Sequence, residues 1–262
     1  MALSLDLSGR TAIVTGASSG VGHSSAVALA RAGAAVVAVG RDQQRLDGVV
    51  AAIEGEGGQA IGVQANLVDD DAPGRIVAAA LDRFGSIEVL ASCAGIYDSA
   101  AVGQPDVDTL DVLDRQWETN ARAPYRLTEA VLPHLSEGAS MVFFSSTMAR
   151  FGIGYGAAYS MSKAAVEAMV RVLAVELGPR QIRVNAISPG WIATPMSAEA
   201  RADPAIENFA IAATPIGRIG DPDEVASVVV YLASDAAAYV HGTVIEVEGG
   251  YPALPMSMLL NA

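Results

Sequence analysis

Short apolar runs alternate with longer stretches of mixed polarity along the whole chain. The short runs are nearly continuous in hydrophobic and β-branched residues, a pattern typical of strands that are buried on both faces. We therefore expect strands at 11–15, 35–39, 60–64, 87–91, 140–145, 183–187 and 243–247. The intervening stretches predict helices at 21–32, 43–56, 72–84, 111–135, 157–177 and 222–234.

Regular alternation of strands and helices indicates right-handed crossovers and a parallel sheet. No charged or Pro/Ser-rich linker divides the chain. The pattern predicts an α/β fold in which residues 1–262 form a single domain: a doubly wound, Rossmann-like, seven-stranded parallel sheet with helices on both faces.

Two segments interrupt this alternation. Residues 97–108 form a polar stretch after the fourth strand, and residues 189–219 form a long connection with four prolines after the sixth. Loops of this length in compact domains are usually functional, and ligands of open α/β sheets bind beyond the carboxyl ends of the strands. We expect both segments there, with 189–219 as a substrate lid. The apolar tail, 251–262, is either a clasp between subunits or a cover on the cleft.

The formal net charge is −13 at pH 7, and no basic block occurs in the sequence. This charge disfavours a nucleic-acid groove or an anionic membrane surface as partner. The single cysteine, Cys93, excludes an internal disulfide and fits a reducing cytosol. Since neither a signal-peptide pattern nor a bilayer-length apolar run is present, we expect a soluble cytoplasmic protein.

A glycine-rich turn at 15–22 follows the first predicted strand and opens the first helix. Gly16 allows a sharp turn, Gly20 allows the backbone to approach a pyrophosphate, and Gly22 allows the helix to lie close to the sheet. The helix amino terminus adds free N–H donors and a partial positive charge. An ordinary strand–helix turn is the alternative, but the order of strand, turn and helix favours dinucleotide binding.

Tyr159 and Lys163 are four residues apart on a predicted helix and therefore share one face. The pKa of a free tyrosine is about 10, and a neighbouring ammonium group lowers it toward the range of proton transfer. Taken alone, the pair fits an exposed helix face equally well. Ser146 changes this balance, because it ends the fifth predicted strand just before that helix.

With these residues the chain resembles the classical short-chain dehydrogenase/reductase family from about Gly9 to Gly250. The shared features are the glycine turn, a serine thirteen residues before the tyrosine, the Tyr-x-x-x-Lys pair, and a Pro-Gly pair followed by a threonine. The resemblance implies an oxidoreductase that transfers a hydride between a nicotinamide cofactor and a carbonyl or secondary alcohol carbon.

The resemblance also implies a role for each matching residue. Tyr159 is the general acid of reduction and the base of oxidation, and Ser146 stabilises the substrate oxygen. Lys163 binds the nicotinamide ribose and lowers the tyrosine pKa, and Asn120 positions a water that links this lysine to solvent. Ile192 and Thr194 dock the nicotinamide carboxamide. The full expected cofactor-binding set is Gly16, Ser18, Ser19, Gly20, Val21, Gly22, Arg41, Asn66, Leu67, Ala94, Gly95, Tyr159, Lys163, Pro189, Gly190, Ile192 and Thr194.

The sequence departs from the family pattern after the fourth strand, where Asn-Asn-Ala-Gly is replaced by Ser-Cys-Ala-Gly at 92–95. Asn66 stands where an aspartate is usual, and Glu248 replaces another aspartate. We interpret Cys93 as a small buried hydrophobe.

Cofactor choice usually depends on the residue after the second strand, where an acid would repel a 2′-phosphate. Here Gly40 and Arg41 occupy that place, which favours NADP(H) over NAD(H). A solvated Arg41 at the start of a helix is the alternative. Ser19 weakens the preference, because many NADP enzymes carry a second basic residue there.

Residues beside the motifs predict an apolar and aromatic substrate pocket, and hence a small-to-medium, uncharged substrate. Tyr155 is expected one turn before Tyr159 on the same helix face. The pocket candidates are Tyr97, Met148, Phe151, Tyr155, Trp191 and Met196. No metal site is expected, because the three histidines lie in different elements without other ligands at metal spacing.

Two questions about the whole protein stay open from the residues alone. A non-catalytic dinucleotide sensor would have the same fold, but retention of the serine, tyrosine, lysine and asparagine argues for chemistry. The resemblance also implies a homotetramer that pairs the helices at 111–135 and 157–177. The alanines of the second helix, such as Ala164 and Ala168, equally suit packing on its own sheet.

Overall fold

The computed structural model describes residues 4–251. Its strands are β1 (Thr11–Thr15), β2 (Ala35–Gly40), β3 (Gln59–Gln64), β4 (Ile87–Ser92), β5 (Leu135–Phe144), β6 (Arg183–Pro189) and β7 (Val244–Val247). Its α-helices are α1 (Gly20–Arg31), α2 (Gln43–Gly55), α3 (Ala72–Phe84), α4 (Thr109–Trp117), α5 (Ala123–Val131), α6 (Ala157–Leu177), α7 (Pro195–Arg201), α8 (Pro204–Ala212) and α9 (Pro222–Ala233).

The strands form one seven-stranded sheet in the order β3-β2-β1-β4-β5-β6-β7. Every neighbouring pair is parallel, which confirms the predicted fold. The order of strands reverses between β1 and β4, and a ligand crevice is expected at this switch point, beyond the carboxyl ends of the two strands.

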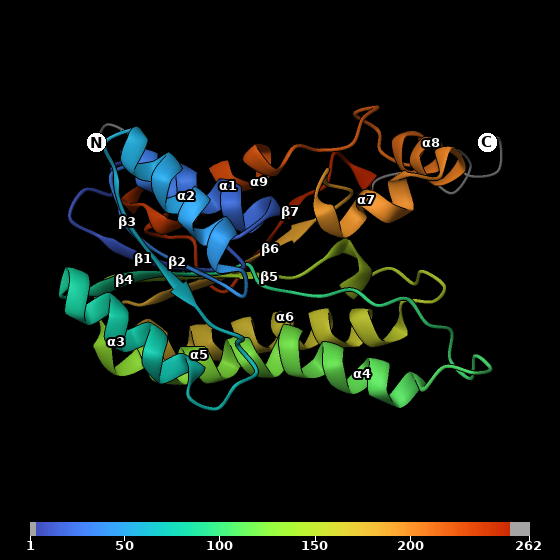
Figure 1. The fold of residues 1–262 in the computed structure, drawn as a ribbon, viewed down its shortest axis with the longest axis horizontal. Coiled ribbons are helices and arrows are strands. Elements are labelled where there is room, and N and C mark those ends of the chain that lie inside the picture. The colour runs from blue at the N-terminus through green and yellow to red at the C-terminus, as the bar shows by residue number, and fades with distance from the viewer. Residues whose placement is uncertain (1–3, 252–262) are drawn as a thin grey trace.

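Helices cover both faces of the sheet (Figure 1). Helices α1, α2 and α9 lie on one face, and α3, α4, α5 and α6 lie on the other. Successive strand residues contribute to opposite cores: Ile13 packs into the core on the α3–α6 side, and Val14 packs into the core on the α1–α9 side. Burial on both faces explains why the strands are continuous apolar runs.

The helix predicted at 111–135 is interrupted in the structure. Asp108 caps α4, a π-helical turn follows at Glu118–Arg122, and α5 then starts. The amide of Ala123 bonds to the carbonyl of Glu118, which inserts one extra residue into the turn. Pro124 has no N–H for the regular bond to position 120 and so favours this irregularity. The predicted helix was also too long, because β5 begins at Leu135.

The sequence suggested an irregular connection at 189–219, but the structure contains helices α7 and α8 there. Each of these helices starts with a proline, Pro195 after Thr194 and Pro204 after Asp203. Proline is well suited to the first helical position, where its missing N–H has no helical partner. Figure 1 shows both helices at the same end of the sheet as the carboxyl ends of β5, β6 and β7. Within residues 4–251 no helix is long and apolar enough to cross a membrane.

Candidate active site

The four residues predicted to carry the chemistry come together beyond the carboxyl end of β5. Ser146 follows β5, Tyr159 and Lys163 lie on α6, and Asn120 lies in the π-helical turn. Their exposed fractions are 9% for Ser146 and Tyr159, 4% for Lys163 and 1% for Asn120. A Cβ added to Gly95 would lie 3.3 Å from both Asn120 Oδ1 and Lys163 Nζ. The space around this glycine is therefore shared by both side chains.

The hydroxyl of Ser146 lies near that of Tyr159 and affects its ionisation. Burial raises the pKa of Tyr159 to about 12, the hydrogen bond with Ser146 lowers that pKa, and the nearby Tyr97 phenol raises it. Ser146 Oγ also accepts a hydrogen bond of 3.2 Å from the amide of Met148, which fixes its place in the turn after β5. The phenol is therefore a proton donor that is held ready beside a second hydroxyl.

Lys163 is the sole lysine of the chain. Its Nζ donates a hydrogen bond of 2.9 Å to the carbonyl of Phe144 and lies 5.6 Å from the centre of the Tyr159 ring. Burial lowers the pKa of this amine to about 8. The lowering of the tyrosine pKa by Lys163 stays a prediction, because in this geometry the favourable contribution comes from Ser146.

Asn120 binds both a backbone segment and a neighbouring side chain. Its Oδ1 accepts from the amide of Ile96 at 2.8 Å, and its Nδ2 donates to the carbonyl of Ile96 at 2.9 Å and to Ser162 Oγ at 3.1 Å. One turn earlier, the fully buried Gln116 makes the same pair of bonds to Asp98, at 3.3 and 3.1 Å. Sequence reasoning missed Gln116, although a glutamine four residues before Asn120 was a visible signal.

Tyr97 lies between the two residues that these amides hold. Its ring meets the ring of Tyr159 edge to face, with 5.1 Å between the centroids and an interplanar angle of 83°. Such pairs favour one mutual orientation of the rings. The predicted pocket residue Tyr97 therefore contacts Tyr159 directly.

The glycine turn between β1 and α1 leaves little room for side chains. Gly16 has φ +67°, and a Cβ on it would lie 2.9 Å from the Cα of Ala94. A Cβ on Gly22 would lie 2.3 Å from the carbonyl oxygen of Gly16, which leaves no room for a side chain. Gly20 has φ +54° and faces Thr194, whose side chain would be 3.3 Å from an added Cβ.

The amino terminus of α1 fits the pyrophosphate of a dinucleotide. The side chain of Ser19 makes no capping hydrogen bond, and no acidic residue lies in the first turn of the helix. The first N–H groups therefore have no side-chain acceptor in their way, and the helix dipole favours an anion there. Ala94 adjoins this turn, since its amide donates to Thr15 Oγ1 at 3.2 Å. Residues after β1, β4 and β6 thus surround one site.

Comparison with known proteins agrees with this geometry. The family model described as Enoyl-(Acyl carrier protein) reductase matches residues 16–252. An uncharacterized oxidoreductase of Methylorubrum extorquens is 41% identical over 246 residues, which are 93% of this chain and 98% of that protein. A short-chain type dehydrogenase/reductase from Mycobacterium marinum has a TM-score of 0.89 at 32% identity, covering 96% of this chain and 98% of that one.

A third relative was solved with cofactor. It is described as a "putative NAD(P) dependent gluconate 5-dehydrogenase" from Beutenbergia cavernae with bound NADP, and it has a TM-score of 0.87 at 36% identity, covering 96% of this chain and all of that chain. The chain belongs to the short-chain dehydrogenase/reductase family. It is therefore an NAD(P)-dependent oxidoreductase that acts on carbonyl or alcohol groups.

At the adenosine end of the expected cofactor site, this short-chain dehydrogenase/reductase exposes Arg41 directly after β2. Among residues 4–251 no acidic side chain pairs with it, whereas its neighbour Asp42 caps α2 and pairs with Arg45 at 3.3 Å. After β3, Asn66 is exposed and Leu67 is buried in the core. Of Asn66 and Leu67, therefore, Asn66 is the one that presents a polar side chain at the surface.

The predicted pocket residues are only partly confirmed as neighbours. Met148, Phe151 and Tyr155 border a hollow of about 550 Å³. Tyr155, however, is not on the helix with Tyr159: α6 begins at Ala157, and Tyr155 has φ +65° and is 62% exposed. The glycines on both sides of this segment explain the error, because glycine disfavours helix.

The connection at 189–219, which was predicted to be a lid, starts and ends beside Gly220. The amide of Gly220 donates to the carbonyl of Trp191 at 2.9 Å, and its carbonyl accepts from the amide of Ala193 at 2.9 Å. Ile192 and Gly220 form an isolated parallel bridge. Trp191 thus lies at the base of this connection, and Met196 lies on α7 with 48% of its surface exposed.

Cys93 occupies a position where the family usually carries asparagine. Burial raises the pKa of its thiol to about 12, and Sγ lies 3.7 Å from the carbonyl oxygen of Ala91. A thiol with such a pKa is a poor nucleophile at neutral pH. In the part of the chain that the structure describes, no group of His, Cys, Asp and Glu side chains is arranged to hold a metal ion.

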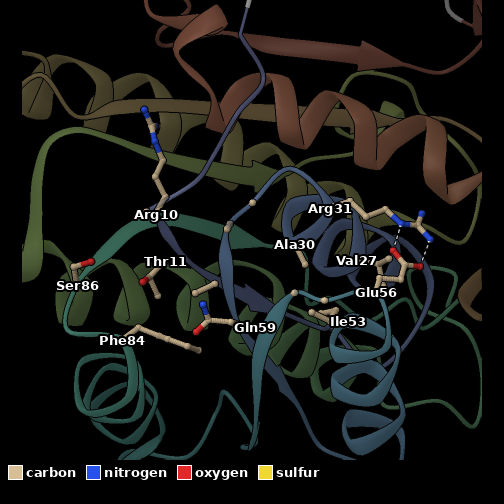
Figure 2. Close-up of a pocket in the computed structure, with 16 residues that line it drawn as sticks. Arg10, Thr11, Val27, Ala30, Arg31, Ile53, Glu56, Gln59, Phe84 and Ser86 are labelled. Carbon is tan, nitrogen blue, oxygen red and sulfur yellow. Dashed lines mark hydrogen bonds and ion pairs between the residues drawn. The ribbon is translucent and has the colours of Figure 1, made fainter.

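A separate cavity of about 470 Å³ lies at the opposite, amino-terminal edge of the sheet (Figure 2). Arg31 and Glu56 form a bidentate ion pair at its border, with both N–O distances 2.6 Å. Arg10 also lines it and binds the carbonyl of Ala233 and the carboxylate of Asp235. None of the predicted site residues lines this cavity.

Proposed function

We propose that this protein transfers a hydride between NADP(H) and the carbonyl or secondary alcohol carbon of a small-to-medium, uncharged substrate, with Tyr159 moving the proton. The observation that carries the proposal is the burial of Ser146 and Tyr159 next to each other, with Lys163 Nζ 5.6 Å from the centre of the Tyr159 ring. When bound, the nicotinamide supplies or accepts the hydride, and the protein supplies position and electrostatics.

In the reduction, Ser146 and Tyr159 both donate to the substrate oxygen. The proton moves from the Tyr159 hydroxyl to this oxygen as negative charge develops on it, and Ser146 stabilises the same charge. A phenol with a pKa of about 12 is protonated at neutral pH, which is the state that the reduction needs. In the oxidation, the phenolate is the base that removes the alcohol proton.

Lys163 and Asn120 act behind this pair. The ammonium of Lys163 favours the phenolate that remains after proton transfer, and it would bond the ribose of the cofactor. Asn120 binds both backbone groups of Ile96 and also Ser162 Oγ, which in turn donates to the carbonyl of Tyr159 at 2.8 Å. The main chain of α6 at Tyr159 is therefore tied to the π-helical turn.

The decisive experiment is Tyr159→Phe, assayed with ketones and secondary alcohols by the absorbance of the reduced cofactor. We expect turnover to fall by about 10³-fold or more, while the Kd for NADPH, measured by fluorescence, changes little. Tyr125→Phe on α5, where the ring is 47% exposed, is the control. Activity near that of the wild type in Tyr159→Phe would overturn the assignment.

The preference for NADP(H) is the second part of the proposal. Arg41 is exposed after β2 without an acidic partner in residues 4–251, and β2 lies next to β1, one of the two strands at the switch point. A guanidinium suits the 2′-phosphate of NADPH. The ratio of kcat/KM for NADPH and NADH tests this, and a preference for NADH would replace it with the NAD-dependent alternative.

The assembly that we propose is a homotetramer. Helix α6 exposes Met161, Val172 and Val175, and α5 exposes Tyr125, so an apolar surface lies on the outer side of this layer. Large exposed apolar patches often mark interfaces. Light scattering with size-exclusion chromatography tests the proposal, and a monomer at assay concentration would exclude it. The tail predicted as a clasp or cover lies outside the described residues beyond Tyr251.

A further inference from the structure

A buried carboxylate on α6 has no part in the mechanism above. Glu167 lies one turn beyond Lys163, on the same face of the helix, and is 7% exposed. Its Oε1 accepts a hydrogen bond of 2.9 Å from Ser145 Oγ, and Oε2 accepts one of 3.4 Å from Arg150 Nε. A third partner, Arg171, lies on the same helix with its Nη1 3.9 Å from Oε2. A charged group at this depth needs such partners to offset its loss of solvation.

The first two partners of this carboxylate flank Ser146 in the sequence. Ser145 immediately precedes Ser146, and Arg150 ends the single 3₁₀ turn that Ser146 begins. The turn is closed by bonds from the amide of Ala149 to the carbonyl of Ser146, at 2.9 Å, and from the amide of Arg150 to the carbonyl of Thr147, at 3.0 Å. Glu167 therefore holds the turn at both of its ends.

The same helix carries Tyr159. Because Tyr159 and Glu167 are two turns apart on one α-helix, their separation is fixed by the helix itself. We propose that Glu167 is a positioning residue that sets the place of the Ser146 hydroxyl relative to the Tyr159 hydroxyl. This inference rests on the proposed function, in which both hydroxyls bind the same substrate oxygen.

A further link extends from this carboxylate across the sheet. Arg150 also pairs with Glu246 on β7, so one guanidinium joins α6, the turn after β5, and the last strand. Ser145 is fixed to β6 as well, because its amide donates to the carbonyl of Ile187 at 2.8 Å. The turn thus has little freedom to move once Glu167 is in place, and misplacement of a reacting group by about 1 Å costs up to about 100-fold in rate.

The test uses Glu167→Gln, Ser145→Ala and Arg150→Gln, with Glu176→Gln as the control at an exposed position of the same helix. Glu167→Gln keeps an acceptor for Ser145 but loses the charge that holds Arg150. We expect kcat to fall about tenfold in each of the three variants, with the Kd for NADPH unchanged. Arg150→Lys is expected to recover part of the activity that Arg150→Gln loses.

The pH profile separates positioning from simple structural support. The hydrogen bond with Ser146 lowers the pKa of Tyr159, so a displaced Ser146 leaves that pKa higher. In the oxidation, where the phenolate is required, the rising limb of kcat against pH is then expected to move to higher pH in Glu167→Gln. An unchanged profile together with an unchanged kcat in Glu167→Gln and Ser145→Ala would overturn the proposal.

A double-variant cycle distinguishes failure of this inference from failure of the proposed function. If Glu167 acts through Ser146, adding Glu167→Gln to Ser146→Ala has no further effect on kcat. Additive losses would show that Glu167 acts by another route and would contradict the inference. Full activity of Ser146→Ala alone would instead contradict the proposed function. If Glu167→Gln fails to fold by circular dichroism, the same cycle is run with Ser145→Ala.

Discussion

Polar side chains are exposed at one edge of the sheet and buried at the other. At the amino edge, a cavity of about 470 Å³ is bordered by Arg31 and Glu56, which pair with each other at the surface. At the carboxyl edge, Ser146, Tyr159 and Lys163 are buried, and Ser146 Oγ and Lys163 Nζ each bond to a backbone group. The two edges therefore differ in how deeply their polar side chains are buried.

The physical reason is the different cost of the two arrangements. An exposed ion pair gains little and costs little, because water screens both charges. A buried hydroxyl or amine loses its hydration and changes its pKa, as the pKa values of about 12 for Tyr159 and about 8 for Lys163 show. Buried groups with strongly shifted pKa values occur mostly where catalysis needs them. The shifted pKa values at the carboxyl edge therefore indicate a functional site.

The largest effect is expected for Lys163→Met. This change removes the positive charge beside Tyr159, and kcat/KM is expected to fall by about 10³-fold, in the range of general acid–base contributions. Steady-state kinetics with a reducible ketone measure it, with Arg75→Met on α3 as control. A comparable loss of kcat/KM in both variants would show that Lys163 matters no more for the reaction than an exposed surface residue.

Next comes the glycine turn. Gly22→Ala places a Cβ 2.3 Å from the carbonyl oxygen of Gly16, so the helix cannot keep its distance to the sheet. We expect the Kd for NADPH to rise at least about tenfold, as measured by fluorescence titration. Gly48→Ala on α2 is the matched control, because nothing lies within 4 Å of its added Cβ. Normal binding in Gly22→Ala would show that cofactor binding does not need this close packing of helix on turn.

The burial of Lys163 also predicts how stability depends on pH. Its pKa is about 8 in the folded protein and 10.5 for the unperturbed side chain, so between these values the unfolded chain binds more protons. The free energy of unfolding of the wild type, minus that of Lys163→Met, therefore rises with pH between 8 and 10.5, by up to roughly 3 kcal/mol. Urea denaturation at several pH values measures this difference. A flat or falling difference would show that the amine is hydrated.

A smaller change is expected at the rim of the carboxyl edge. Arg41→Glu places a negative charge where the 2′-phosphate is proposed to lie, so kcat/KM for NADPH is expected to fall about tenfold and the value for NADH to rise. Arg45→Glu, on the first turn of α2, is the control. Equal responses to both cofactors would remove Arg41 from the site.

The smallest effect is expected at the amino edge. Glu56→Gln breaks the ion pair with Arg31, yet both groups are exposed, and kcat/KM is expected to stay within about twofold of the wild type. A large loss of activity would mean that the amino-edge cavity communicates with the reaction site and would break the contrast between the two edges.

The sequence predicted the parts of the fold that depend on local spacing. The apolar runs predicted all seven strands, and the i, i+4 spacing of Tyr159 and Lys163 predicted their shared face. Pro195 and Pro204 were misinterpreted as loop residues, although both follow capping residues and start helices.

Other features depend on contacts between distant segments. Gln116 is buried because Asp98, eighteen residues earlier, offers two backbone groups to its amide. Glu167 is buried because Ser145 and Arg150 face it from the turn after β5. No local pattern reveals such partners, and Tyr155 was misplaced because the helix starts only after the neighbouring glycines.

The single lysine has a practical consequence. Because Lys163 supplies the only ε-amine of the chain, any reagent that acylates side-chain amines has one internal target, and that target lies in the reaction site. The amount of Lys163 labelling in the unfolded chain measures the total polypeptide. The amount of Lys163 that is protected in the folded protein measures the intact sites. The ratio of the two gives the fraction of a preparation that is correctly folded, without the use of any substrate.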